Sequence, residues 1–167
     1  LCGGRLLGLV PKTHLPNYSE FYEQRHFHAG METPVMVDWM GGEAPMGTNL
    51  LFRCRELPEL VVAAEVCEDV WVPSPPSIRH GLAGATVIAN CSASNDLVGK
   101  DVYRNALISG QSARLICGYV YANAGEGEST QDVVYSGHNM IAENGIMLAE
   151  AERFANQSVY GEIDIQR

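Results

Sequence analysis

The chain has 167 residues, enough for one domain with a sizeable hydrophobic core, and 46% of them are hydrophobic, as in folded globular proteins. A net charge of −9 without a basic cluster argues against nucleic acids and anionic membranes as partners. No apolar run approaches the ~20 residues that span a bilayer. The five cysteines lack CxxC spacing, which favours free thiols over a disulfide framework or a metal site. We therefore expect a cytoplasmic protein that binds no metal here.

Apolar runs and the breaks between them predict alternating strands and helices. The expected strands are, in chain order, residues 5–10, 35–40, 60–67, 85–91, 115–122, 132–135, 138–142, 146–151 and 159–165. The expected helices are residues 17–23 capped by Asn17 or Ser19, a short helix ending at Leu82 and capped by Ser74 or Ser77, and residues 99–114. Glu143-Asn144-Gly145 predicts a hairpin turn. The order strand, helix, strand, helix, strand predicts an α/β domain with a mixed sheet.

The most informative segment is the run 60–66, which Cys67 follows directly. A continuous run of small and branched apolar residues is typical of a strand buried on both faces. A cysteine at the carboxyl end of such a strand points into the crevice where open α/β sheets bind ligands. The adjacent Glu68 and Asp69 suit a nucleophile in a polar pocket. A small apolar residue that merely ends a buried strand explains the cysteine equally well.

Two further strand ends carry polar side chains that suit chemistry. Lys12 follows the first strand and is one of only two lysines in the chain, with Lys100. An ammonium there must face a cleft or a partner, although a surface lysine at a strand end is the simpler interpretation. The strand 85–91 is followed by Ser92 and Ser94. A thiol beside a cation predicts nucleophilic catalysis in which the cation stabilises an oxyanion.

These motifs resemble the nitrilase, or carbon–nitrogen hydrolase, superfamily. Residues 10–18 resemble its lysine motif and residues 65–71 its cysteine motif. Further stretches resemble the glutaminase domain of glutamine-dependent NAD(+) synthetases, and they are residues 88–95, 111–114, 118–121, 127–132 and 137–145. The resemblance implies an α-β-β-α sandwich with a mixed sheet and a Glu–Lys–Cys triad. It also implies that the domain hydrolyses glutamine to supply ammonia for the amidation of deamido-NAD.

The resemblance implies a role for five residues of this chain. Cys67 is the expected nucleophile that forms a thioester, and Lys12 is expected to stabilise the oxyanion. Tyr18, Glu68 and Ser94 fall where the family contacts glutamine. Judged from their residue types alone, Tyr18 fits helix packing and Ser94 fits helix capping at least as well. No cofactor is expected in this domain, whereas ATP and Mg²⁺ belong to the synthetase domain of the family.

Two features depart from the family pattern. The third triad member is implied to be a glutamate well upstream of the lysine motif, and no acidic residue precedes Lys12. Glu20 and Glu23 lie on the other side of the lysine, so neither is expected to be that base. No GxxxxGK[ST] phosphate loop is present. We therefore expect residues 1–167 to be the larger, C-terminal part of an N-terminally truncated glutaminase domain whose synthetase domain lies outside this chain.

Two other functions remain open from the sequence. One is a different nitrilase-type amidase that acts on another small amide. The other is a non-catalytic fragment that acts as a packing or oligomerisation module. The family resemblance also implies that the parent protein is a homo-oligomer in which this domain contacts the synthetase domain.

Overall fold

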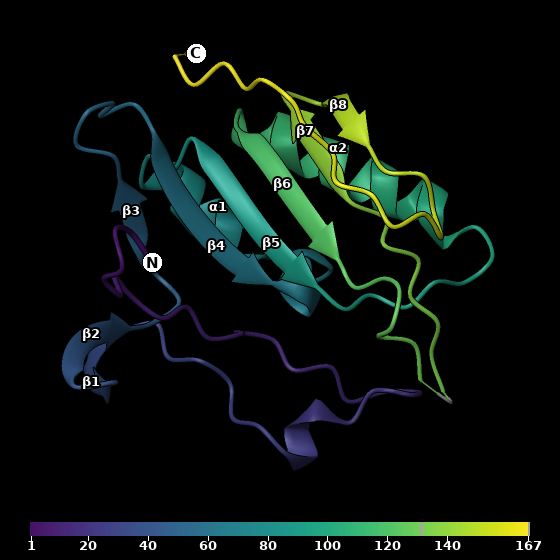
Figure 1. Cartoon of the computed structure of the whole chain (residues 1–167), viewed down its shortest axis with the longest axis horizontal. Coiled ribbons are helices and arrows are strands. Elements are labelled where there is room, and N and C mark those ends of the chain that lie inside the picture. Colours follow the sequence, from purple (N-terminus) through teal and green to yellow (C-terminus); the bar gives the residue numbers. More distant parts are fainter. Residues whose placement is uncertain (131, 167) are drawn as a thin grey trace.

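The computed structural model describes residues 1–130 and 132–166 and is built around a mixed six-stranded sheet with strand order β3-β4-β5-β6-β7-β8 (Figure 1). β4, β5 and β6 run parallel, while β3, β7 and β8 pair antiparallel at the two edges. The strands are β3 (Leu51–Arg53), β4 (Val61–Val66), β5 (Val87–Ser92), β6 (Gly118–Asn123), β7 (Met140–Glu143) and β8 (Ile146–Glu150). The mixed α/β class expected from the sequence is confirmed.

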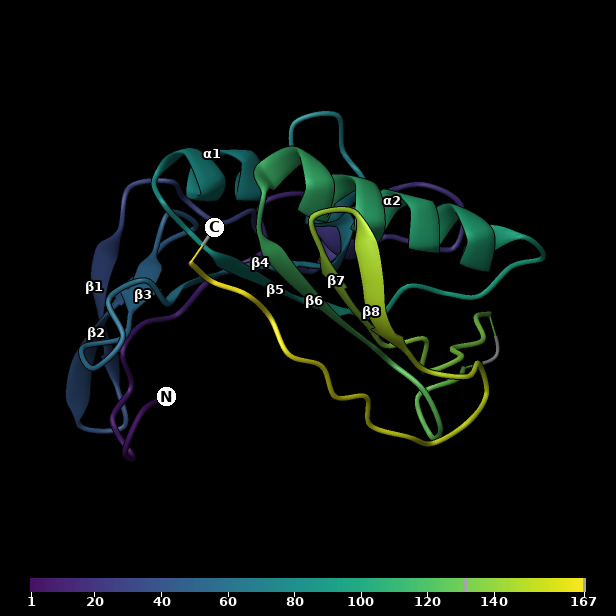
Figure 2. The same ribbon diagram turned by 90° about the horizontal axis from the view of Figure 1, so that it is seen from above.

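Both α-helices cover the same face of this sheet (Figure 2). α1 (Pro76–Leu82) connects β4 to β5, and α2 (Lys100–Leu115) connects β5 to β6. Crossovers between parallel strands share one hand, so successive helices of this kind pack on one side. The core between helices and sheet contains Ile88, Ile108, Tyr119 and Met140, all fully buried. The described residues thus form one helical layer packed on one six-stranded sheet (Figure 2).

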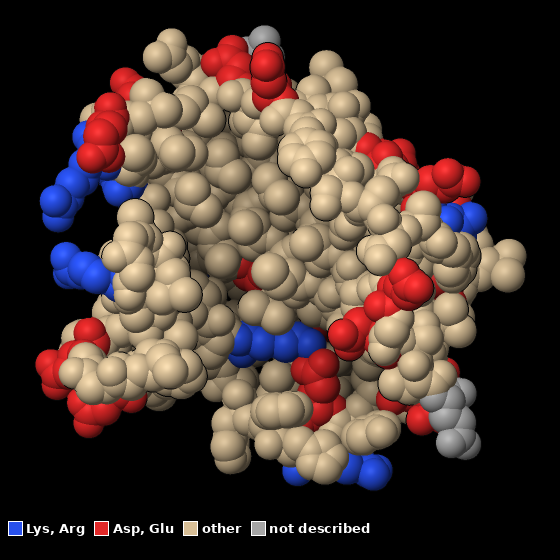
Figure 3. Space-filling view, viewed as in Figure 1, with Lys and Arg blue, Asp and Glu red and all other residues tan. Residues whose placement is uncertain are grey.

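The opposite face of the sheet is only partly covered. The C-terminal segment crosses it near β6–β8, where Ile163 lies against Gly118 and Gly161 lies near Ile141 (Figure 2). Figure 3 shows a hollowed, largely uncharged area at the centre of the view, with charged residues around its rim. In β4, alternate residues are buried toward the helices, whereas Val62, Ala64 and Val66 are half-buried. The expectation of burial on both faces is therefore wrong for β4 in this chain.

The N-terminal segment differs from the expectation. Residues 5–10 do not form a buried strand, because the segment makes only two isolated bridges, Arg5 to Cys2 and Leu9 to Met46. Met46 is the last residue of β2 (Gly42–Met46), and β2 forms a separate hairpin with β1 (Val35–Trp39). The strand expected at 35–40 is therefore confirmed, but it does not join the main sheet.

Several element boundaries also differ. The helix expected at 17–23 is a single 3-10 turn, η1 (Glu23–Arg25), without a side-chain cap. The helix α1 is confirmed, but Pro75 occupies its N-cap and Ser77 lies inside the helix. Residues 115–117 are not part of β6, and the strands expected at 132–135 and 159–165 are not formed. No helix in residues 1–130 and 132–166 is long and apolar enough to cross a membrane. Gln131, in one of the family-like stretches, lies outside the described residues.

The expected hairpin turn between β7 and β8 is confirmed. Asn144 and Gly145 adopt positive φ angles of 46° and 86°, as a two-residue hairpin turn of this hand requires. The turn lies against α2, where the Gly145 N–H donates to the Ser112 hydroxyl at 3.0 Å. A methyl group at residue 145 would approach the Ala113 side chain to 3.1 Å. Glycine therefore serves both the backbone conformation and the close packing at this position.

Candidate active site

Cys67 begins a 3-10 turn, η2 (Cys67–Val70), immediately after β4. Its φ angle of +49° lies in the left-handed region, which costs a non-glycine residue about 1–3 kcal/mol and persists only where the surroundings impose it. Two side chains hold the backbone at this bend. Asp69 accepts a hydrogen bond from the Val66 N–H at 2.9 Å, and Asn90 accepts one from the Cys67 N–H at 3.1 Å. The thiol is half-buried at the carboxyl edge of the sheet.

Asp69 also joins this bend to the segment that carries Lys12. Its carboxylate accepts the backbone N–H groups of Thr13 at 3.1 Å and His14 at 2.7 Å. The Asp69 side chain is only 1% exposed, and a buried carboxylate is tolerated when backbone donors surround it. One side chain therefore fixes the lysine segment beside the cysteine turn.

The Lys12 ammonium forms a two-pronged ion pair with Glu23. Its Nζ lies 2.6 and 2.7 Å from the two carboxylate oxygens, and the side chains are 13% and 30% exposed. Lys12, Glu23 and Cys67 line one open cavity of about 610 Å³. The ion pair holds the ammonium at the wall of the cavity that Cys67 also lines, and it removes the cost of leaving a partly buried cation alone.

A second open cavity, of about 420 Å³, lies on the other side of Cys67. Tyr18, Glu68 and Ser94 line it together with Cys67, so the structure brings these expected site residues together. The Tyr18 hydroxyl donates to both Glu68 oxygens, at 3.0 and 3.1 Å. Burial, followed by this hydrogen bond, raises the pKa of Tyr18 to about 12, so the hydroxyl remains a donor at neutral pH.

Lys100, at the start of α2, also lines this second cavity. Its ammonium donates to the Asn95 side-chain oxygen at 2.5 Å and lies 5.2 Å from the centre of the Trp71 ring, a cation–π contact. Burial, and then the nearby Arg104, lower the pKa of Lys100. The cavity therefore presents a carboxylate, Glu68, and an ammonium to one ligand.

Ser94 is placed by hydrogen bonds between its loop and β6. The Ser94 N–H donates to the Asn123 side-chain oxygen at 2.9 Å, and the Asn123 amide donates back to the Ser94 carbonyl at 3.1 Å. These two bonds join the Ser94 backbone to the Asn123 side chain and continue the pairing of β5 with β6 beyond the end of β5. They fix the loop that follows β5, and hence the polar groups along this edge of the cavity.

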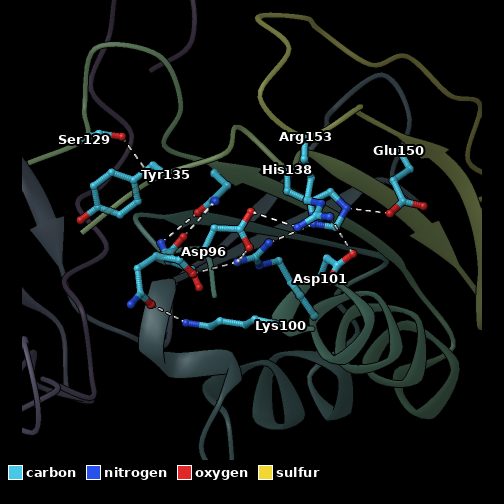
Figure 4. A network of polar contacts seen from close by, with 12 residues as sticks. Asp96, Lys100, Asp101, Ser129, Tyr135, His138, Glu150 and Arg153 are labelled. Carbon is cyan, nitrogen blue, oxygen red and sulfur yellow. Dashed lines mark hydrogen bonds and ion pairs between the residues drawn. The ribbon is translucent and has the colours of Figure 1, made fainter. Parts of the chain in front are cut away.

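A buried polar network supports the same loop from behind (Figure 4). Arg104 of α2 is fully buried and donates to the Asn95 carbonyl at 3.0 Å and to His138 Nδ1 at 3.0 Å. An arginine can only donate, so Nδ1 accepts and His138 Nε2 donates to Glu150 at 2.6 Å. Arg153 reaches Asp96 of the loop at 3.5 Å. Ser94 and Lys100 are thus anchored to a rigid support.

The family comparison agrees with this geometry. Residues 3–167 match the model of the carbon–nitrogen hydrolase family. The chain belongs to the carbon–nitrogen hydrolase family. Among curated relatives of this chain, the glutamine-dependent NAD(+) synthetase of Mycobacterium tuberculosis (strain ATCC 25618 / H37Rv) is 48% identical over 151 residues, which cover 90% of this chain and 22% of the relative. That of Aquifex aeolicus is 28% identical over 97% of this chain and 25% of the relative.

Solved structures give the same family and fold. A glutamine-dependent NAD(+) synthetase from Cytophaga hutchinsonii matches with a TM-score of 0.78 and 28% identity, over 95% of this chain and 25% of that chain. An amidase from Nesterenkonia sp. matches with a TM-score of 0.57 and 19% identity, over 84% of this chain and 44% of that chain, which shows the fold alone. This chain spans about a quarter of the length of the synthetases that it matches.

The sequence does not indicate every residue that shapes the candidate site. The position of Glu23 along the chain argues against a catalytic base there, yet its carboxylate contacts the Lys12 ammonium. Lys100 received no role, although the scarcity of lysine that drew attention to Lys12 applied to it equally. From the sequence, Asp69 is only an acidic neighbour of Cys67, and Asn90 is only a residue of an expected strand. Their hydrogen bonds to distant backbone groups leave no local sequence signal.

Proposed function

We propose that this chain is the glutaminase part of a glutamine-dependent NAD(+) synthetase and hydrolyses glutamine to supply ammonia for the amidation of deamido-NAD. The observation that carries the proposal is the position of Cys67 between two cavities. One cavity holds the Lys12–Glu23 pair, and the other presents Glu68 and Lys100. Relatives at 48% identity bear the synthetase name, which supports the same substrate.

The polar groups of the second cavity complement the groups of glutamine. The α-ammonium of glutamine matches the Glu68 carboxylate, which Tyr18 orients through a hydrogen bond. The α-carboxylate of glutamine matches the Lys100 ammonium, and Ser94 adds a hydrogen-bonding group at the same edge of the cavity. With its charged end held there, the side-chain carboxamide extends toward Cys67. Binding both charged groups selects an α-amino acid over a simple amide.

The proposed chemistry is acyl transfer through a thioester. The Cys67 sulfur attacks the carboxamide carbon, and the carbonyl electron pair moves to oxygen as the S–C bond forms. The Lys12 ammonium stabilises this oxyanion, and Glu23 holds the ammonium in place. The oxyanion electron pair re-forms the carbonyl as the C–N bond breaks, and the leaving nitrogen takes the proton that the thiol gave up, so that ammonia departs. Water attacks the γ-glutamyl thioester, which releases glutamate and restores the thiol.

Further properties follow from the same proposal. ATP and Mg²⁺ would act in the synthetase domain, which would receive the ammonia from this domain. The parent enzyme would be a cytoplasmic homo-oligomer. The base that completes the triad would be a glutamate upstream of Lys12, as the family resemblance implies.

The test is carried out in a full-length synthetase that contains this segment. Cys67→Ala should abolish NAD formation with glutamine and leave NAD formation with ammonia intact, because free ammonia bypasses the glutaminase site. Cys54→Ala is the matched control, since Cys54 lies next to β3 and lines neither cavity. Equal loss with both nitrogen sources would contradict the proposal. Faster hydrolysis of short aliphatic amides than of glutamine would instead indicate a different amidase.

A further inference from the structure

A row of buried polar side chains lies beneath Cys67 on the helix-covered face of the sheet. Glu65 of β4, Asn90 of β5 and Tyr119 of β6 are each at most 1% exposed. Glu65 and Asn90 are paired across the neighbouring parallel strands. None of the three lines the cavities on either side of Cys67, so a substrate bound there does not touch them. Polar groups are costly to bury in a core, and their placement calls for a structural or functional reason.

The hydrogen bonds of this row have a single consistent direction. Glu65 accepts the Ser77 N–H at 2.9 Å through one oxygen and the Tyr119 hydroxyl through the other. The Tyr119 oxygen accepts the Asn90 amide N–H at 3.3 Å. The Asn90 side-chain oxygen is thereby turned toward the Cys67 N–H, at 3.1 Å. The Ser92 hydroxyl also donates to this oxygen, at 2.7 Å. A flip of the amide would place an NH₂ group against the Cys67 N–H and lose the bonds to that N–H and to Tyr119.

We propose that Asn90 is a positioning residue for the nucleophile, oriented by Tyr119 and Glu65 so that its oxygen holds the Cys67 N–H. This bond keeps Cys67 in its left-handed conformation, with φ +49°, in which the thiol borders both cavities. Without it, the residue relaxes toward the negative φ angles that a non-glycine residue prefers, and the thiol turns away. Only the catalytic test of this inference rests on the proposed glutaminase function.

The first measurement is the reactivity of the thiol, which requires no knowledge of the substrate. The rate constant for alkylation of Cys67 by iodoacetamide is followed by mass spectrometry, with the exposed Cys2 as internal reference. The variants are Asn90→Ala and Tyr119→Phe. The matched control is Thr86→Val, which removes a side-chain bond to the Val61 N–H at the opposite end of β4 and β5. The free energy of unfolding is measured for each variant.

A misplacement of about 1 Å can cost about 100-fold in rate, so we expect both variants to slow Cys67 alkylation at least about tenfold relative to Cys2. The double variant should be no slower than Asn90→Ala alone, because both residues act through one bond. Asn90→Asp, which keeps an oxygen facing the Cys67 N–H, should retain more reactivity than Asn90→Ala. Thr86→Val should lower the unfolding free energy and leave the ratio of the two alkylation rates unchanged.

The catalytic readout separates this inference from the proposed function. If the protein hydrolyses glutamine, Tyr119→Phe should lower kcat with little change in KM, since Tyr119 does not line the binding cavity. If Tyr119→Phe and Asn90→Ala lower stability as Thr86→Val does but leave Cys67 reactivity unchanged, the row is purely structural and the inference is wrong. Slowed alkylation in a protein that does not hydrolyse glutamine would support the positioning role and refute the glutaminase proposal. Should Tyr119→Phe fail to fold, the comparison of Asn90→Asp with Asn90→Ala decides the question.

Discussion

The Asp69 carboxylate accepts a 2.7 Å hydrogen bond from the backbone N–H of His14, 55 positions away in the sequence. The same carboxylate accepts the N–H of Thr13 and that of Val66. One buried side chain thus connects the residues that follow Lys12 to the residue that precedes the nucleophile. The relative placement of the lysine and the thiol depends on this connection.

Asp69→Asn should therefore lower both stability and glutaminase activity. Its NH₂ group would face a backbone N–H in place of an accepting oxygen, and an unsatisfied buried donor costs about 1–3 kcal/mol. Urea unfolding measures the stability, and ammonia release from glutamine measures the activity. Asp101→Asn is the control, because the partly exposed pair of Asp101 with Arg153 at 3.3 Å should matter by less than about 1 kcal/mol. Equal effects of the two substitutions would contradict the connecting role of Asp69.

Lys12→Ala should lower glutamine-dependent activity by about 100- to 1,000-fold, the usual effect of removing one oxyanion donor. Ammonia-dependent NAD formation by the full-length synthetase should persist. Glu23→Gln should cause a smaller loss of activity, because the Lys12 ammonium remains but the carboxylate that positions it is replaced by a neutral amide. Glu32→Gln removes the exposed ion pair with Arg79, also at 2.6 Å, and should leave the activity unchanged. A Glu23→Gln variant as active as Glu32→Gln would show that the Lys12 ion pair plays no part in catalysis.

A glutamine-shaped electrophile should modify Cys67 before any other cysteine. The cavity that presents Glu68 and Lys100 places such a reagent against this thiol. Cys117 should resist modification, because it is buried and its burial raises its pKa to about 12. Peptide mass spectrometry after partial labelling gives the order. Preferential labelling of the exposed Cys2 or Cys91 would count against the proposed binding site.

Glu65→Gln should change how stability depends on pH. Burial raises the pKa of Glu65 above its ordinary value of 4.5, despite the hydrogen bonds from Tyr119 and Ser77. The folded state therefore favours the protonated carboxyl, and this contribution is present below about pH 4.5 and lost as the pH rises through the folded-state pKa. The unfolding free energy of the protein minus that of the variant should fall with rising pH. A difference that stays constant from pH 4 to 8 would contradict this prediction.

The sequence by itself determined the elements that carry local periodicity and the edge where chemistry occurs. The apolar runs that became β4 and β5 predicted strands whose carboxyl ends are followed by Cys67 and Ser94, and the structure places both residues on one cavity. The 3.6-residue period predicted α2, and Asn144-Gly145 predicted the β7–β8 turn. These elements can be predicted from the sequence because each depends on residues that lie close together in the chain.

Only the tertiary structure decided which segments pair and which polar groups meet. Residues 5–10 and 159–165 have the composition of strands, but a strand forms only where a neighbouring edge accepts its backbone bonds, and neither segment joins the six-stranded sheet. The partners Glu23 for Lys12 and Asn90 for Cys67 likewise follow from the fold. An apolar pattern specifies which face of an element is buried. The partner of a buried polar group depends on distances between side chains and backbone groups that no local pattern contains.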